Sequence, residues 1–108
     1  MGLIDVKDEM TFGKKLSEVK EAVRSTISSL GWKLKDESGN TFECSNGVSI
    51  MSLGSYIMIS LKNVGGKTNV EIHSRDKTGG LMMVGGNLKS KRNIKQFFDK
   101  LTQKVAAL

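Results

Sequence analysis

Residues 32–75 read WKLKDESGNTFECSNGVSIMSLGSYIMISLKNVGGKTNVEIHSR, and this stretch decides the fold. Apolar and polar residues alternate along most of it, which is typical of strands that bury one face of a sheet. Turn signals at Gly39, Asn46-Gly47 and Gly65-Gly66 divide it. The pattern therefore predicts four consecutive antiparallel strands. The residues expected on the buried face are Trp32, Leu34, Phe42, Cys44, Ile57, Ile59, Leu61, Val70 and Ile72.

Helical spacing appears on both sides of this stretch. Residues 14–30 place Leu16, Val19, Val23, Ile27 and Leu30 on one stripe, and Gly31 follows where a left-handed residue would end the helix. A second helix is expected from Ser90 as its N-cap. Its apolar stripe comprises Ile94, Phe97, Phe98, Leu101, Val105 and Leu108.

A short strand at 9–12, in which Met10 and Phe12 alternate with polar residues, precedes the first helix. The expected order is β-α-β-β-β-β-α. Two amphipathic helices must bury their stripes, and the sheet has one clearly apolar face. We therefore expect an α+β two-layer sandwich, with an antiparallel sheet and both helices on one of its faces.

Length and composition are those of one soluble domain. The chain has 108 residues, of which 38% are hydrophobic and 26% charged, so residues 1–108 are expected to form a single domain. No window approaches the run of about 18 apolar residues that crosses a membrane. The single cysteine, Cys44, cannot form an internal disulfide, and residues 1–6 do not resemble a signal peptide. A cytoplasmic location is therefore expected.

Three short motifs carry a resemblance: Gly31-Trp32-Lys33, Val70-Glu71-Ile72-His73-Ser74 and Lys91-Arg92-Asn93-Ile94. They resemble corresponding places in small bacterial proteins of unknown function. The chain departs from these proteins at Met83-Val84-Gly85-Gly86, where they commonly carry an aspartate before the glycine. The element order is similar to that of the TATA-binding-protein repeat and, with elaborations, of the helix-grip lipid-carrier proteins. The resemblance implies a fold and a bacterial source but no activity.

The residue types that catalysis or metal binding requires are scarce. Alternation places Cys44 on the buried face and His73 on the open one, which argues against a cysteine–histidine nucleophile pair. No Cys-x-x-Cys or His-Glu-x-x-His spacing occurs, so neither a metal site nor a cofactor is predicted. Gly80 and Gly85 have the spacing of a P-loop start, but Gly86 stands where lysine is required. We expect a protein that is not an enzyme.

Basic residues are concentrated in the second half of the chain. Residues 55–108 hold ten basic and three acidic side chains, whereas residues 1–54 hold seven and eight. Because helix N-termini attract anions, a basic start to the second helix predicts contact with phosphate, nucleic acid or an anionic lipid surface. The alternative is that these side chains simply extend into water. The candidates are Lys89, Ser90, Lys91, Arg92 and Lys95.

Residues 76–89 are expected to form a glycine-bracketed loop with an apolar centre. Its candidate contact residues are Gly80, Leu81, Met82, Met83, Val84, Gly85 and Gly86. They could form a self-association surface that yields a homodimer, or a tip that touches a membrane. They could also form an extra edge strand or a loop tucked against the helices.

The open sheet face offers a further contact surface. Its candidates are Met51, Tyr56, Met58 and His73, which could equally be ordinary sheet residues. The leading functional expectation is a small non-enzymatic binding module with an anionic partner. The alternative is a helix-grip-like carrier that holds a small apolar ligand between sheet and helix.

Overall fold

The structure is a computed structural model that describes residues 5–46, 55–76 and 83–108. The described elements follow one another in the expected order β-α-β-β-β-β-α. They are β1 (Asp5–Phe12), α1 (Leu16–Ser29), β2 (Lys33–Ser38), β3 (Thr41–Asn46), β4 (Ser55–Val64), β5 (Lys67–Asp76) and α2 (Met83–Ala106).

The five strands form one antiparallel sheet in the spatial order β1-β5-β4-β3-β2. This confirms that the four strands of the central stretch pair consecutively. β1 begins at Asp5, earlier than the short strand expected at 9–12, and it pairs with β5 over its whole length. Charged residues at positions 7–9 hide its alternation. The sequence-based turn at Gly47 lies outside the described residues.

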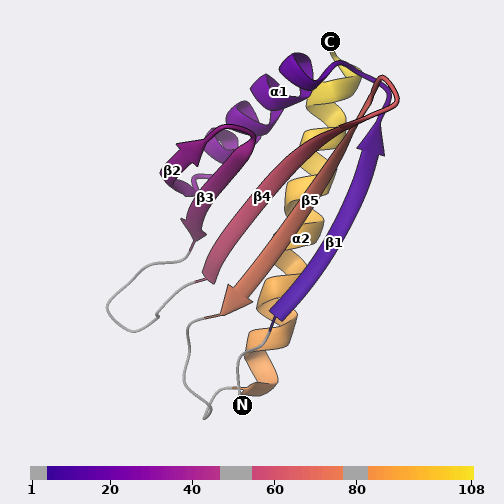
Figure 1. The fold of residues 1–108 in the computed structure, drawn as a ribbon. Helices are drawn as coiled ribbons and strands as arrows, with labels where there is room; N and C mark the ends of the chain where they lie inside the picture. Colours follow the sequence, from indigo (N-terminus) through magenta and orange to yellow (C-terminus); the bar gives the residue numbers. More distant parts are fainter. Residues whose placement is uncertain (1–4, 47–54, 77–82) are drawn as a thin grey trace.

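Both helices lie on the same side of the sheet, which confirms the two-layer α+β sandwich (Figure 1). α2 runs along the sheet behind β5 and β1, and α1 lies behind the short β2–β3 hairpin. Gly31 has a φ of 74°, as expected of the residue that ends a helix, and Gly65 and Gly66 also have positive φ in the β4–β5 turn.

An apolar core fills the space between the layers. The Trp32 and Phe97 rings stack with centroids 5.9 Å apart, and Phe98 meets Phe97 edge-on at 5.4 Å. The Trp32–Phe97 stack fastens α2 to the segment that follows α1, whereas Phe97 and Phe98 both belong to α2. The buried hydrophobic residues are Phe12, Val19, Ala22, Val23, Ile27, Trp32, Phe42, Cys44, Ile57, Ile59, Leu61, Val70, Ile72, Ile94, Phe97, Phe98, Leu101 and Val105.

Two residues expected in the core are exposed. Leu34 is 38% exposed because β2 is an outer strand whose register shifts between Leu34 and Asp36. Leu108 is 55% exposed because it follows the end of α2 and has no layer opposite it. The stripe of α1 is buried as expected, except that Leu16 and Leu30 are only partly covered.

The start of α2 differs from the expectation. The helix begins at Met83, so the expected N-cap Ser90 lies inside it and Met83-Val84-Gly85-Gly86 form helical turns instead of loop. The expectation treated glycine pairs as helix breakers. A glycine costs a helix only about 1 kcal/mol, which tertiary packing of the remaining turns readily outweighs.

Arg24 ties α1 to β2. Its guanidinium donates to both carboxylate oxygens of Glu37, at 3.2 and 2.6 Å, and also to Glu21. The hydrogen bond from Arg24 lowers the pKa of Glu37, and the nearby charge of Lys20 acts in the same direction. The Arg24 guanidinium also lies 6.0 Å from the centre of the Phe42 ring. This bidentate ion pair joins α1 to the outer strand β2.

We expect the contribution of this ion pair to vanish in acid. A lowered folded-state pKa stabilises the fold above the ordinary value of 4.5, and this stabilisation is lost as the pH falls through the folded-state pKa. Urea unfolding should therefore show a larger difference in the free energy of unfolding between wild type and Arg24→Ala at pH 7 than at pH 3. The exposed pair of Lys95 and Asp99 gives the control variant, Lys95→Ala, with little separation at either pH. An equal Arg24→Ala effect at both pH values would contradict the assignment.

Cys44 is expected to be unreactive in the folded state. Its side chain is fully buried, and desolvation raises the pKa of the thiol to about 12. Because the thiolate is the reactive form, modification by a disulfide reagent at pH 8 should follow opening of the fold. Modification in native buffer should be at least roughly a hundredfold slower than in urea. Equal rates would show that the helix layer does not cover Cys44.

Candidate functional site

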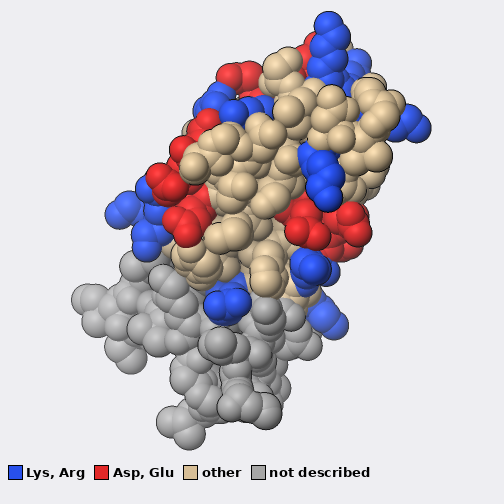
Figure 2. Space-filling view, in the orientation of Figure 1, with Lys and Arg blue, Asp and Glu red and all other residues tan. Residues whose placement is uncertain are grey.

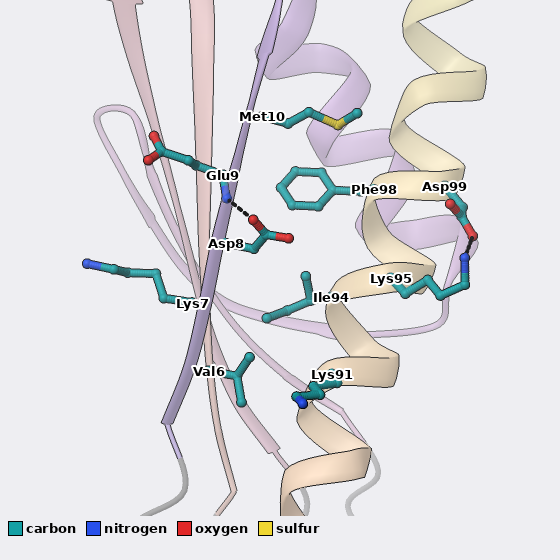
Figure 3. A pocket seen from close by; sticks show the side chains of 10 residues that line it. All are labelled: Val6, Lys7, Asp8, Glu9, Met10, Lys91, Ile94, Lys95, Phe98 and Asp99. Atoms are coloured by element: carbon teal, nitrogen blue, oxygen red, sulfur yellow. Dashed lines mark hydrogen bonds and ion pairs between the residues drawn. The ribbon is translucent and has the colours of Figure 1, made fainter.

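A groove of about 510 Å³ runs between the outer strand β1 and helix α2. Val6 and Met10 point into it from β1, and Ile94 and Phe98 face them from α2 (Figure 3). Met10 is 40% exposed, so part of its side chain meets solvent along the groove. The groove exists because alternation turns every second residue of β1 toward the helix. Its apolar walls suit the apolar part of a ligand.

Asp8 lies among these apolar side chains. It points toward α2 between Val6 and Met10, whereas Lys7 and Glu9 point away from the groove (Figure 3). The Oδ1 atom of Asp8 accepts a hydrogen bond from the backbone N–H of Glu9 at 2.8 Å. The groove therefore combines an apolar floor with a carboxylate at its middle.

The margins of the groove are basic and acidic. Lys91 lies beside Val6, and Lys95 pairs with Asp99 at 3.3 Å on the solvent side of α2 (Figure 3). Near the other end of the strand, Met10 Sδ accepts a long hydrogen bond from the Thr102 hydroxyl at 3.9 Å. That contact joins β1 to α2.

The expected anion site required α2 to begin at Ser90, whereas the helix begins at Met83. Lys91 and Arg92 are exposed, but they lie more than two turns after the start of α2, where backbone N–H groups bond within the helix. Lys95 lies one turn further on and is paired with Asp99. The backbone of Lys89 and Ser90 is helical. Two of the expected anion-binding residues, Lys91 and Lys95, nevertheless line the groove.

The expected apolar loop is divided by the helix boundary. Gly80, Leu81 and Met82 lie outside the described residues, and the residues from Met83 to Gly86 are helical. The hypothesis that 76–89 is one loop is therefore wrong over its second half.

The open face of the sheet carries the expected candidates that the structure describes. Tyr56, Met58 and His73 are half-buried there and, together with Arg75, line a hollow of about 320 Å³. The Tyr56 hydroxyl donates a hydrogen bond to the Glu43 carboxylate, which raises the pKa of Tyr56. Met51 lies outside the described residues.

The charges on this face are mixed. Figure 2 shows acidic and basic side chains around its margins, with uncharged surface between them. Lys7 and Glu71 form one such pair at 3.9 Å. The face shown in Figure 2 therefore does not carry the charge of a single sign that would attract a polyanion.

Chemistry-bearing residues do not gather in the described parts of the chain. Cys44 lies on the helix-covered face of the sheet and His73 on the opposite face, as expected. Among residues 5–46, 55–76 and 83–108 no group of three or more His, Cys, Asp or Glu side chains is placed to hold a metal ion. In the same segments, neither helix combines the length and the apolar character needed to span a bilayer.

Comparisons with known proteins show the fold. No family model matches the sequence, and no curated protein matches it. Ara h 8.0201 superposes with a TM-score of 0.65 at 10% identity, covering 99% of this chain and 100% of that one. TTHA0849 from Thermus thermophilus gives 0.57 at 12% identity, covering 95% and 97%. A conserved protein from Geobacillus kaustophilus gives 0.54 at 15% identity, covering 95% of each chain. The described elements and these likenesses together show that the chain has a helix-grip-like α+β fold.

Proposed function

We propose that this chain is a small binding module that holds the apolar part of a ligand in the groove between β1 and α2, without a catalytic step. The observation that carries the proposal is the groove of about 510 Å³ with Val6, Met10, Ile94 and Phe98 on its walls. Ligand sites are commonly apolar clefts of about 300–1,000 Å³ with a few polar groups. Asp8 and Lys91 supply such polar groups.

The interior of the sandwich is a less suitable place for a ligand. Phe42 and Phe97 are fully buried, and Phe97 stacks on Trp32 between the sheet and the helices. A domain of this size buries only about two-thirds of its unfolded surface, so it needs these residues for its own stability. The groove at the edge of the sheet can be occupied without disturbing that core.

The helix-grip-like fold supports a binding role, since the sequence resembles the helix-grip lipid-carrier class in element order. Folds host many functions, however, so the proposal depends on the groove itself.

The test is a fluorescence titration with N-phenyl-1-naphthylamine, a neutral apolar probe that avoids general attraction to a chain of net charge +6. Saturable binding at one site, displaced by dodecanoate or by dodecyltrimethylammonium, is the expected result. Fluorescence that rises without saturation, or that saturates only as the protein unfolds, would overturn the proposal.

A second candidate function is favoured by the exposed basic residues of α2. Lys91 and Arg92 are neighbours on its surface, and each could contact a phosphate group. The double variant Lys91→Glu with Arg92→Glu should then weaken binding to double-stranded DNA. The slope of log affinity against log salt should fall in magnitude by about 2, because each phosphate that a basic side chain neutralises adds about 0.9 to it.

The matched control reverses two exposed lysines at the far end of the sheet, Lys62→Glu with Lys67→Glu. Both double variants change the net charge equally. An identical weakening in both would show that only net charge matters, and an unchanged affinity in the α2 variant would remove the anionic partner from consideration.

A further inference from the structure

β1 is a regular and exposed outer strand. It pairs with β5 from Asp5 to Phe12 without a register shift, and its residues 7–11 are all exposed. An outer strand bonds to one neighbour only, so alternate backbone N–H and C=O groups point away from the sheet. In the described sheet, β1 therefore offers a template on which a further strand can form.

The opposite edge of the sheet is protected. β2 contains a register shift between Leu34 and Asp36, whereas β1 contains none. Irregular pairing hinders the addition of a strand. The two edges of the described sheet therefore differ in their readiness to pair.

The groove lies directly beside this template. A strand added next to β1 would turn every second side chain toward α2, at intervals of about 7 Å. Those side chains would meet Val6, Asp8 and Met10 in turn, because cross-strand neighbours share a face. The matching order on the added strand is apolar, basic, apolar.

We propose that the ligand of the groove is an extended peptide segment with the pattern apolar–x–basic–x–apolar, which adds to the sheet beside β1. The inference rests on the proposed function, since it names the ligand of the same groove. The two apolar side chains occupy the spaces beside Val6 with Ile94 and beside Met10 with Phe98, and the basic side chain meets the carboxylate of Asp8 (Figure 3).

Charge complementarity at Asp8 favours this partner over a second copy of the chain. Two copies of β1 that pair antiparallel, with their helices on the same side of the joined sheet, are related by a two-fold axis through one residue of the strand. In the two registers with the greatest overlap this residue is Asp8 or Glu9, so Asp8 faces a second Asp8 or Met10. The first register also forms two Lys7–Glu9 pairs, but they lie on the open face of the sheet and not in the groove. A basic side chain opposite Asp8 instead forms an attractive pair within the groove.

The test uses the blocked peptide acetyl-Thr-Val-Thr-Lys-Thr-Ile-Thr-amide, whose pattern is the same in both chain directions, and its lysine-to-glutamate analogue. Wild type is expected to bind the lysine peptide about tenfold more tightly than the glutamate peptide. Asp8→Lys should reverse this preference. The control Glu9→Lys makes the same charge change at the next exposed residue, on the other face of the strand, and should keep the wild-type preference.

Hydrogen exchange followed by NMR gives the second readout. Saturating lysine peptide should slow exchange of alternate amides within 6–10 of wild type, because an added strand bonds them. Binding of the apolar probe with no preference between the peptides, or with no new protection in β1, would overturn the peptide inference and leave the proposed function standing. Failure of the probe to bind would overturn both.

Discussion

Replacing Phe97 by alanine is expected to lower the free energy of unfolding by about 3–5 kcal/mol, the range for a large aromatic removed from a core. Phe97 is fully buried and contacts rings on both sides, Trp32 at 5.9 Å and Phe98 at 5.4 Å. Its removal would leave a cavity between α2 and the rest of the sandwich.

Urea unfolding measures this effect, with far-UV circular dichroism and the fluorescence of Trp32, the single tryptophan, as probes. The matched control is Val64→Ala at a position 51% exposed, for which a change within about 0.5 kcal/mol is expected. A Phe97→Ala cost below about 1 kcal/mol would show that α2 is not fastened through this ring.

Introducing a charge into the groove is expected to remove most of the affinity for N-phenyl-1-naphthylamine. Met10→Lys replaces an apolar wall of the groove by a charged side chain, and an apolar probe that covers the ammonium removes part of its hydration. We expect the dissociation constant to rise by about tenfold or more, equivalent to about 1.4 kcal/mol. A fluorescence titration of wild type and variant measures this change.

Leu34 provides a closely matched control. It is 38% exposed against 40% for Met10, and both lie on the helix-facing side of an outer strand. Leu34→Lys therefore makes the same change at the opposite edge and should leave the affinity within about twofold of wild type. Equal reductions in affinity in the two variants would place the probe outside the groove.

The sandwich could be predicted from the sequence because local pattern and burial agree in its central parts. Val19, Val23 and Ile27 keep helical spacing, and β5 alternates between polar and buried residues. In β4, Ile57, Ile59 and Leu61 keep the period of two on the buried face. The differences between expectation and structure lie at an outer strand and at the start of a helix. Leu34 alternates correctly but lies on an outer strand, and Gly85-Gly86 looks like a break although α2 continues through it.

The groove could not be predicted because it joins segments from opposite ends of the chain. Nothing local to residues 5–12 shows that they lie against α2, since that depends on β1 pairing with β5. The charges that hide the alternation of β1 include Asp8, which helps to define the groove. A prediction would have required the position of β1 in the sheet, which topology alone supplies.

The most direct test of the account is a set of intermolecular nuclear Overhauser effects with the apolar probe bound. We expect effects from the protons of N-phenyl-1-naphthylamine to the Met10 methyl group, the Ile94 methyl groups and the Phe98 ring. Effects confined to Tyr56 and Met58 on the open sheet face would contradict it, because they would place the binding site on the other side of the sheet.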